Sequence, residues 1–265
     1  IVRELEYASN GTVGFYTGYE TLDVSPSDVL TSATFSYKQM AGNVTISGLE
    51  QIQNSGTEAV INLLESRIGV LEKTMSNILS TSLYSDGTGT NGKEVGGLQL
   101  LVADAGTGTV GGINSSTFTF FQNVQTTATS SAFSTTNIQS DMNTIYLSLV
   151  RGADSPDLIM ADTNAYKSFL GSLQAIQRVT SDRVASSGFT SVQYLNSDVI
   201  FDDACPANKM YFLNTDYLRL EVAANRNFVP GESRMSVSQD ALVQPMFWSG
   251  NLTCSNRALQ GVIHT

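Results

Sequence analysis

Residues 87–93, Gly-Thr-Gly-Thr-Asn-Gly-Lys, come nearest to a known chemical motif in this sequence. They match the GxxxxGK part of a phosphate-binding loop, in which backbone N–H groups at a helix start hold phosphate and a Ser or Thr after the Lys binds magnesium. Glu94 stands at that magnesium-binding position, and a predicted long helix precedes the motif where a strand is required. We therefore interpret residues 87–93 as a flexible turn without a nucleotide site.

One histidine and two cysteines are further side chains with catalytic or metal-binding chemistry. His264 is the only histidine and stands one residue before the last, where we expect a frayed side chain. A Ser-His-Asp triad, a Cys-His pair or a multi-histidine metal site therefore cannot form. Cys205 and Cys254 fit neither a CxxC pair nor a zinc spacing, and we expect both thiols to be reduced and partly buried.

Several aspartates flank short predicted strands and are candidates for a carboxylate pair of the glycosidase type. They are Asp154, Asp157, Asp162, Asp202 and Asp203. We interpret them as solvated turn residues, because acids at strand ends usually serve turns. The pair Asp202 and Asp203 also lacks the run of alternating oxygen ligands that calcium needs. The sequence thus predicts no catalytic, cofactor-binding or metal-binding residue and no enzyme.

The charge and the hydropathy of the chain argue against two further classes of protein, those that bind specific nucleic-acid sequences and those that span a membrane. The 24 acidic and 14 basic side chains give a net charge of -10, so the chain repels nucleic-acid phosphates and sequence-specific binding to nucleic acid is disfavoured. Charged residues make up 14%, against about 25% in a typical domain, which suits a subunit covered by its neighbours. No window is apolar enough to span a membrane. Because residue 1 is Ile within a strand-like run, we expect that a natural N-terminal segment precedes it.

Residues 1–48 have the pattern of extended chain. Strand-like runs at 1–7, 13–19 and 33–37 are separated by turn-forming Asn10-Gly11 and Pro26. We expect a long hairpin, much of it exposed.

The next segment has the periodicity of an amphipathic helix. Apolar residues recur at steps of three and four and so share one helix face: Val60, Ile61, Leu64, Ile68, Leu71, Met75, Ile78, Leu79 and Leu83. Charged and polar residues fill the opposite side. The pattern predicts one helix over residues 56–84, or about seven turns or more.

The rest of the chain predicts a mixture of helices and strands in an α+β fold without repeats. After a short apolar helix or strand at 98–103, the Gly-, Ser- and Thr-rich stretch 106–135 predicts loops and irregular strands. A helix at 137–150, a buried strand at 157–162 and a helix at 164–179, capped by Thr163, follow. The predicted strands beyond them lie at 192–195, 199–201, 210–213, 217–222, 241–248 and 252–263.

Several stretches, taken together and in order, resemble the major capsid proteins of tailed bacteriophages, the Hong Kong 97-like fold family. They cover the chain from about residue 50 to its end, and none is a catalytic fingerprint. The similar stretches are INLLESRI (61–68), LYSDGTG (83–89), GGI (111–113), PDLIMAD (156–162), QAIQR (174–178), MYFLNT (210–215), QDALV (239–243) and WSGNLTCSNRALQGV (248–262).

The resemblance implies a fold in which an extended E-loop hairpin precedes a long spine helix of a peripheral domain, and an axial domain forms the capsomer centre. On this chain, 1–48 would be the E-loop region. Residues 49–134 would be the peripheral domain, with the spine helix at about 50–84. Residues 135–231 would be mostly the axial domain, and 232–265 would be strands that return to the peripheral domain.

The resemblance also implies a function and partners. The chain would be a structural subunit of the icosahedral head of a double-stranded DNA phage, built of hexamers and pentamers in the host cytoplasm. Its partners would be copies of itself, the portal, and scaffold or decoration proteins; it would enclose DNA without reading its sequence and would use no cofactor. Some relatives crosslink a Lys to an Asn between subunits. Lys38 is the only Lys in the hairpin region, no partner is marked, and we expect no crosslink.

Two other classes fit the sequence less well. Another virion protein or a secreted adhesion-type structural protein, which should be a monomer or trimer, would explain the Ser-, Thr- and Asn-rich surface. It would not explain one long helix followed by mixed α+β structure. A hydrolase is last, because no nucleophile with its base and no metal set can be assembled.

Overall fold

A computed structural model describes residues 1–53, 63–173 and 192–265. The chain divides into two compact units. Unit 1 comprises Ile1–Phe35, Leu101–Arg219 and Thr253–Thr265, and unit 2 comprises Ser36–Leu100 and Leu220–Leu252. In the described ranges, no helix is long and apolar enough to cross a membrane.

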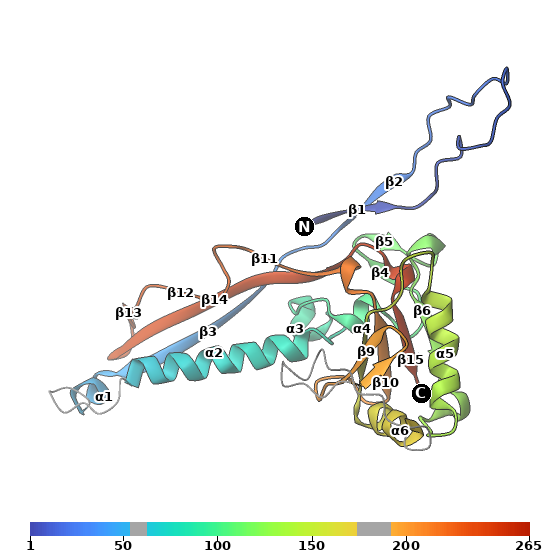
Figure 1. Ribbon diagram of the computed structural model, residues 1–265. Helices are drawn as coiled ribbons and strands as arrows, with labels where there is room; N and C mark the ends of the chain where they lie inside the picture. The colour runs from blue at the N-terminus through green and yellow to red at the C-terminus, as the bar shows by residue number, and fades with distance from the viewer. Residues whose placement is uncertain (54–62, 174–191) are drawn as a thin grey trace. The chain divides into compact units, whose positions relative to one another are not determined.

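Unit 1 is built around a six-stranded mixed sheet with the strand order β6-β15-β10-β7-β9-β8. The β15–β6 and β7–β9 pairs are parallel and the others antiparallel. Two helices, α5 (Ile138–Leu149) and α6 (Thr163–Leu173), pack against it and bury their apolar faces with the sheet in one core (Figure 1). The strands are β6 (Val124–Thr127), β7 (Leu158–Ala161), β8 (Val192–Tyr194), β9 (Ser197–Phe201), β10 (Lys209–Leu213) and β15 (Gly261–His264).

Most predicted elements of unit 1 are confirmed, including α5, β7 and the start of α6, whereas residues 174–179 of the predicted helix lie outside the described residues. The predicted cap is wrong by one residue. The Oδ1 atom of Asp162 accepts a hydrogen bond from Ala165 N at 2.9 Å, so Asp162 caps α6 and Thr163 is its first residue. The Asp162 Oδ2 atom accepts a second bond from Asn208 N, at 2.8 Å.

The N-terminal hairpin of unit 1 is confirmed, but it is shorter than predicted. Strands β1 (Val2–Glu6) and β2 (Leu30–Thr34) pair antiparallel and anchor on buried Leu5, Ala33 and Phe35. Between them, residues 7–29 form no strand, so the predicted strand at 13–19 is wrong. A strand needs a partner for its backbone groups, and Gly18 (φ +39°) turns this segment instead.

Unit 2 is a twisted sheet covered by one long helix. Strand β3 (Lys38–Ser47) pairs antiparallel with β14 (Ala241–Cys254) along all ten of its residues. Shorter strands complete the sheet: β11 (Leu218–Val222), β12 (Val229–Pro230) and β13 (Arg234–Met235). Helix α2 (Leu63–Ser82) runs along β3 and packs a core of Met75, Val95, Met246 and Trp248 (Figure 1).

The predicted helix over 56–84 is only partly confirmed. Helix α2 covers residues 63–82 of the predicted helix, a short helix, α1 (Gly48–Gln53), lies before it in the sequence, and residues 54–62 lie outside the described residues. On the apolar face of α2, Met75 is 2% exposed, whereas Ile78 is 51% exposed. The reason is local, because an open recess of the sheet faces Ile78.

The C-terminal strands also differ from the prediction. The predicted strands at 241–248 and 252–263 are one 14-residue strand, β14, followed by a 3₁₀ turn (Arg257–Leu259) and β15. Residues 253–265 and 101–134 belong to unit 1, and the long helix belongs to unit 2. The cause is long-range pairing, since β15 pairs with β6 and β10.

Candidate assembly interface

The motif-like residues 87–93 form a turn, as expected. They follow helix α2, and the short helix α3 (Gly89–Gly92) ends at once. The Glu94 carboxylate accepts a hydrogen bond from Thr90 Oγ1 at 3.0 Å, and the Lys38 ammonium donates to the Gly92 carbonyl. The geometry closes the turn on itself and offers no helix start to a phosphate.

Four of the five candidate aspartates serve local structure, and two of these, Asp162 and Asp202, follow the paired residues Ala161 and Phe201 of the parallel strands β7 and β9. Asp157 accepts from Thr215 N at 2.8 Å, Asp202 from Ala204 N at 2.9 Å, and Asp154 from the Tyr217 hydroxyl at 3.1 Å. Asp162 caps α6. Within the described residues, no three His, Cys, Asp or Glu side chains gather as a metal site.

His264 and the cysteines occupy ordered positions. His264 was expected to be frayed, but it ends β15, pairs with Lys209 and lies with its Nε2 atom 3.2 Å from Gln125 Oε1. The prediction failed because β15 is held on both sides by neighbouring strands. Cys205 and Cys254 are free thiols and buried, and burial raises the pKa of each to about 12.

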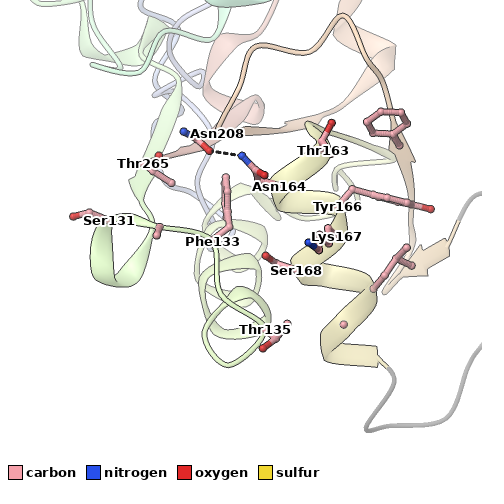
Figure 2. Close-up of a pocket in the computed structure, with 14 residues that line it drawn as sticks. Ser131, Phe133, Thr135, Thr163, Asn164, Tyr166, Lys167, Ser168, Asn208 and Thr265 are labelled. Carbon is pink, nitrogen blue, oxygen red and sulfur yellow. Dashed lines mark hydrogen bonds between the residues drawn. The ribbon is translucent and has the colours of Figure 1, made fainter.

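An open hollow of about 880 Å³ lies on unit 1 beside α6 (Figure 2). Asn164 donates a hydrogen bond to Asn208 at 3.0 Å across its rim, and Phe133 and Tyr166 line it. Lys167 is the one charged side chain among the described residues that line it. The described part of its lining therefore offers no Asp, Glu, His or Cys side chain for acid–base or metal chemistry.

The loop of the hairpin presents large apolar side chains to solvent. Phe15 and Tyr19 are fully exposed, and Val13, Tyr16, Leu22 and Val24 are mostly exposed. Exposed apolar groups in this number mark a contact surface, since a monomer gains nothing from them. Among the aromatic side chains, Trp248 is buried in the core of unit 2, whereas Tyr16 and Tyr19 lie on this surface.

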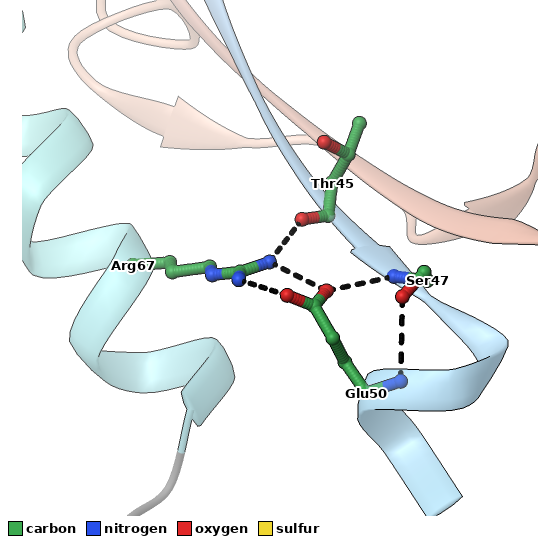
Figure 3. A network of polar contacts seen from close by, with 4 residues as sticks. All are labelled: Thr45, Ser47, Glu50 and Arg67. Atoms are coloured by element: carbon green, nitrogen blue, oxygen red, sulfur yellow. Dashed lines mark hydrogen bonds and ion pairs between the residues drawn. The ribbon is translucent and has the colours of Figure 1, made fainter.

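A polar network fixes α1 to the end of β3 in unit 2 (Figure 3). Ser47 and Glu50 form a capping box, in which Ser47 N donates to Glu50 Oε2 (3.1 Å) and Glu50 N donates to Ser47 Oγ (3.3 Å). From α2, Arg67 donates two bonds to the Glu50 carboxylate (2.6 and 3.1 Å) and one to the Thr45 carbonyl (2.6 Å). One arginine thus joins a helix start, a strand end and a second helix.

Replacing Arg67 with alanine is expected to raise the pKa of Glu50. Hydrogen bonds from Arg67, and next from Ser47, lower that pKa from 4.5 to about 2. The network therefore contributes stability above pH 4.5 and loses it as the pH falls toward about 2. An NMR titration of the Glu50 carboxyl carbon in Arg67→Ala should show a midpoint shifted toward 4.5. An unchanged midpoint in Arg67→Ala would mean that the hydrogen bonds from Ser47, and not Arg67, lower the pKa of Glu50.

Comparison with known proteins addresses the fold. No protein-family model matches the sequence, and no curated protein is significantly similar to it. Among solved structures, a chain of the cyanophage A-1(L) capsid asymmetric unit matches with a TM-score of 0.75 and 18% identity, over 100% of this chain and 87% of that chain. This chain has the fold of a phage capsid protein.

Other solved structures share this capsid fold. The capsid of the native GTA particle matches with a TM-score of 0.68 and 8% identity, over 100% of this chain and 84% of that one. The holo-SrpI encapsulin of Synechococcus elongatus matches with a TM-score of 0.63 and 9% identity, over 90% of this chain and 76% of that one. The α+β fold that the resemblance implied, with its hairpin and long helix, is confirmed as a phage capsid fold.

Proposed function

We propose that this chain is the structural subunit of a tailed-phage head, whose copies associate into hexamers and pentamers that close as an icosahedral shell around double-stranded DNA. The observation that carries the proposal is the apolar hairpin loop, residues 8–28, whose side chains are almost all exposed on their own chain in a protein with the capsid fold. A second copy can cover that surface through a heterologous contact, and repeated heterologous contacts close into rings and shells.

The domain roles follow from the same proposal. Strands β1 and β2 with their loop act as the E-loop, α2 with its sheet as the spine and body of the peripheral domain, and the six-stranded sheet of unit 1 as the axial domain. The net charge of -10 supports a container for DNA, because a surface that bound phosphate tightly would hinder packaging. The protein acts in the virion shell without enzymatic activity, is assembled in the bacterial cytoplasm, and meets the portal and scaffold or decoration proteins there.

Negative-stain electron microscopy with light scattering of the chain, expressed alone and with its neighbouring reading frames, tests the proposal. Closed particles of uniform size, or rings of five and six subunits, are expected. A persistent monomer or trimer in both preparations would overturn the proposal and favour an adhesion-type virion protein.

A further inference from the structure

The sequence contains two Asn-Gly pairs, Asn10-Gly11 and Asn91-Gly92, and both asparagines are exposed. In such a pair the glycine nitrogen can attack the side-chain amide, because glycine has no Cβ to block a close approach. The nitrogen bonds to the asparagine Cγ atom, the Cγ–Nδ2 bond breaks, and ammonia leaves with the proton of the attacking N–H. Water then opens the succinimide ring at either carbonyl, which leaves aspartate or isoaspartate.

The two pairs differ in what holds the attacking nitrogen. Within the described residues, no group accepts a hydrogen bond from the Gly11 N–H, and nothing lies within 4 Å of a Cβ placed at Gly11. The Gly92 N–H, in contrast, donates to the Thr88 carbonyl at 3.0 Å, and the Gly92 carbonyl accepts a bond from the Lys38 ammonium. Attack in the second pair must therefore first break a hydrogen bond that has no counterpart in the described structure around Gly11.

Three donors surround the oxygen that takes up charge when Asn10 is attacked. Asn10 Oδ1 accepts hydrogen bonds from Thr12 N (3.0 Å), Thr12 Oγ1 (2.8 Å) and Ser27 Oγ (3.2 Å). Addition of a nitrogen to Cγ moves negative charge onto this oxygen, and donors that are already in place stabilise that charge, as they do in an oxyanion hole. The bond from Thr12 N also spans Gly11, so it holds the side chain folded over the peptide that attacks it.

We propose that Asn10 is a site of spontaneous deamidation in the folded chain and that Asn91 is protected from it. The product puts a new carboxylate into residues 4–37, which hold five acids and no Lys, Arg or His. In isoaspartate the main chain also gains one carbon, and the carbonyl that accepted the Ser27 hydroxyl becomes part of the main chain. The charge and the shape of the hairpin loop therefore change with time after synthesis, whether or not copies assemble.

Peptide mass spectrometry of the full, unassembled chain, sampled during incubation at neutral pH, measures both sites in one preparation. Asn10 should deamidate about tenfold faster than Asn91, because freeing the Gly92 amide breaks one hydrogen bond. In urea, where the fold is lost, the two rates should become similar. Equal rates in the folded chain would overturn the proposal. A difference of the same size in urea would mean that the neighbouring sequence sets the rates, and would overturn it as well.

Variants at two loop positions test the activation of Asn10 separately. Thr12→Val removes the hydroxyl donor and keeps the backbone N–H, so deamidation should slow about fivefold, the rate equivalent of one hydrogen bond. Thr12→Ser keeps the hydroxyl and is the matched control, with the original rate expected. Gly11→Ala places a Cβ beside the attacking nitrogen and should slow the reaction too. Equal rates in Thr12→Val and Thr12→Ser, or an unchanged rate in Gly11→Ala, would contradict the proposed chemistry.

Discussion

Replacing Arg257 with alanine is expected to lower the free energy of unfolding of unit 1 by about 2–6 kcal/mol, from about 1–3 kcal/mol for each of two buried carbonyls left unsatisfied. The side chain is 0% exposed, and its guanidinium donates to Leu101 O (2.6 Å), Phe121 O (3.0 Å) and Asn123 Oδ1 (2.9 Å). It also lies 5.4 Å from the centre of the Phe121 ring. Alanine would remove this donor from the Leu101 and Phe121 carbonyls, whereas Asn123 Oδ1 would keep its bond from Ala103 N at 3.1 Å. A buried acceptor costs free energy when it is unsatisfied.

Burial lowers the pKa of Arg257 to about 10, so the side chain stays charged at neutral pH although neutral groups provide its hydrogen bonds. Urea unfolding of the unassembled chain, followed by circular dichroism and by hydrogen exchange of the amides in residues 101–123, measures the loss. Arg234→Ala is the control, because its ion pair with Glu232 is largely exposed (side chains 79% and 84%). Its cost should stay within about 0.5 kcal/mol. Equal, small losses in both variants would contradict the role of Arg257.

Replacing residues 8–29 with a short Asn-Gly turn is expected to abolish closed particles and leave the fold intact. The loop is exposed along almost its whole length, so its removal takes little from the stability of unit 1. The melting temperature should stay within about 2 °C of the original value. Strands β1 and β2 remain, because Leu5, Ala33 and Phe35 anchor them in the core.

Light scattering measures the yield of closed particles, and calorimetry on the same preparation measures the melting temperature, so the effect on assembly is separated from the effect on stability. A version that keeps the loop length but replaces Phe15 and Tyr19 with serine is the matched control for apolar contact, and it should assemble poorly as well. Closed particles of normal yield from the shortened chain would contradict the proposed contact between copies.

The sequence pattern predicted those helices and strands whose burial depends on residues close together in the sequence. Helix α5 and the middle of α2 follow from apolar spacing, because each buries one face against a sheet. Strand β7 follows from its short apolar run, because it lies inside the six-stranded sheet. The same spacing misplaced Ile78, since periodicity identifies a face but does not show whether the facing surface is filled. The strand at 13–19 failed for a related reason, because alternation favours a strand only where a partner strand exists.

The features that depend on distant residues had no local signal. Lys38 and Lys93 are far apart in sequence and meet at one recess only through the packing of α2 on β3. Arg257 is a single basic residue in a turn, and its acceptors lie in residues 101–123. No local pattern shows that β15 returns to pair with β6, a parallel contact between segments more than a hundred residues apart.

The burial of Cys205 and Cys254 has a practical consequence for labelling. Both sulfhydryls are un-ionised at neutral pH, and the thiolate is the form that reacts with maleimides. The two native cysteines are therefore expected to react slowly with a maleimide dye while the protein is folded. A single cysteine introduced at exposed Tyr19 would be the one fast-reacting sulfur among the described positions, so a dye placed there would report directly on when each copy becomes covered during particle formation.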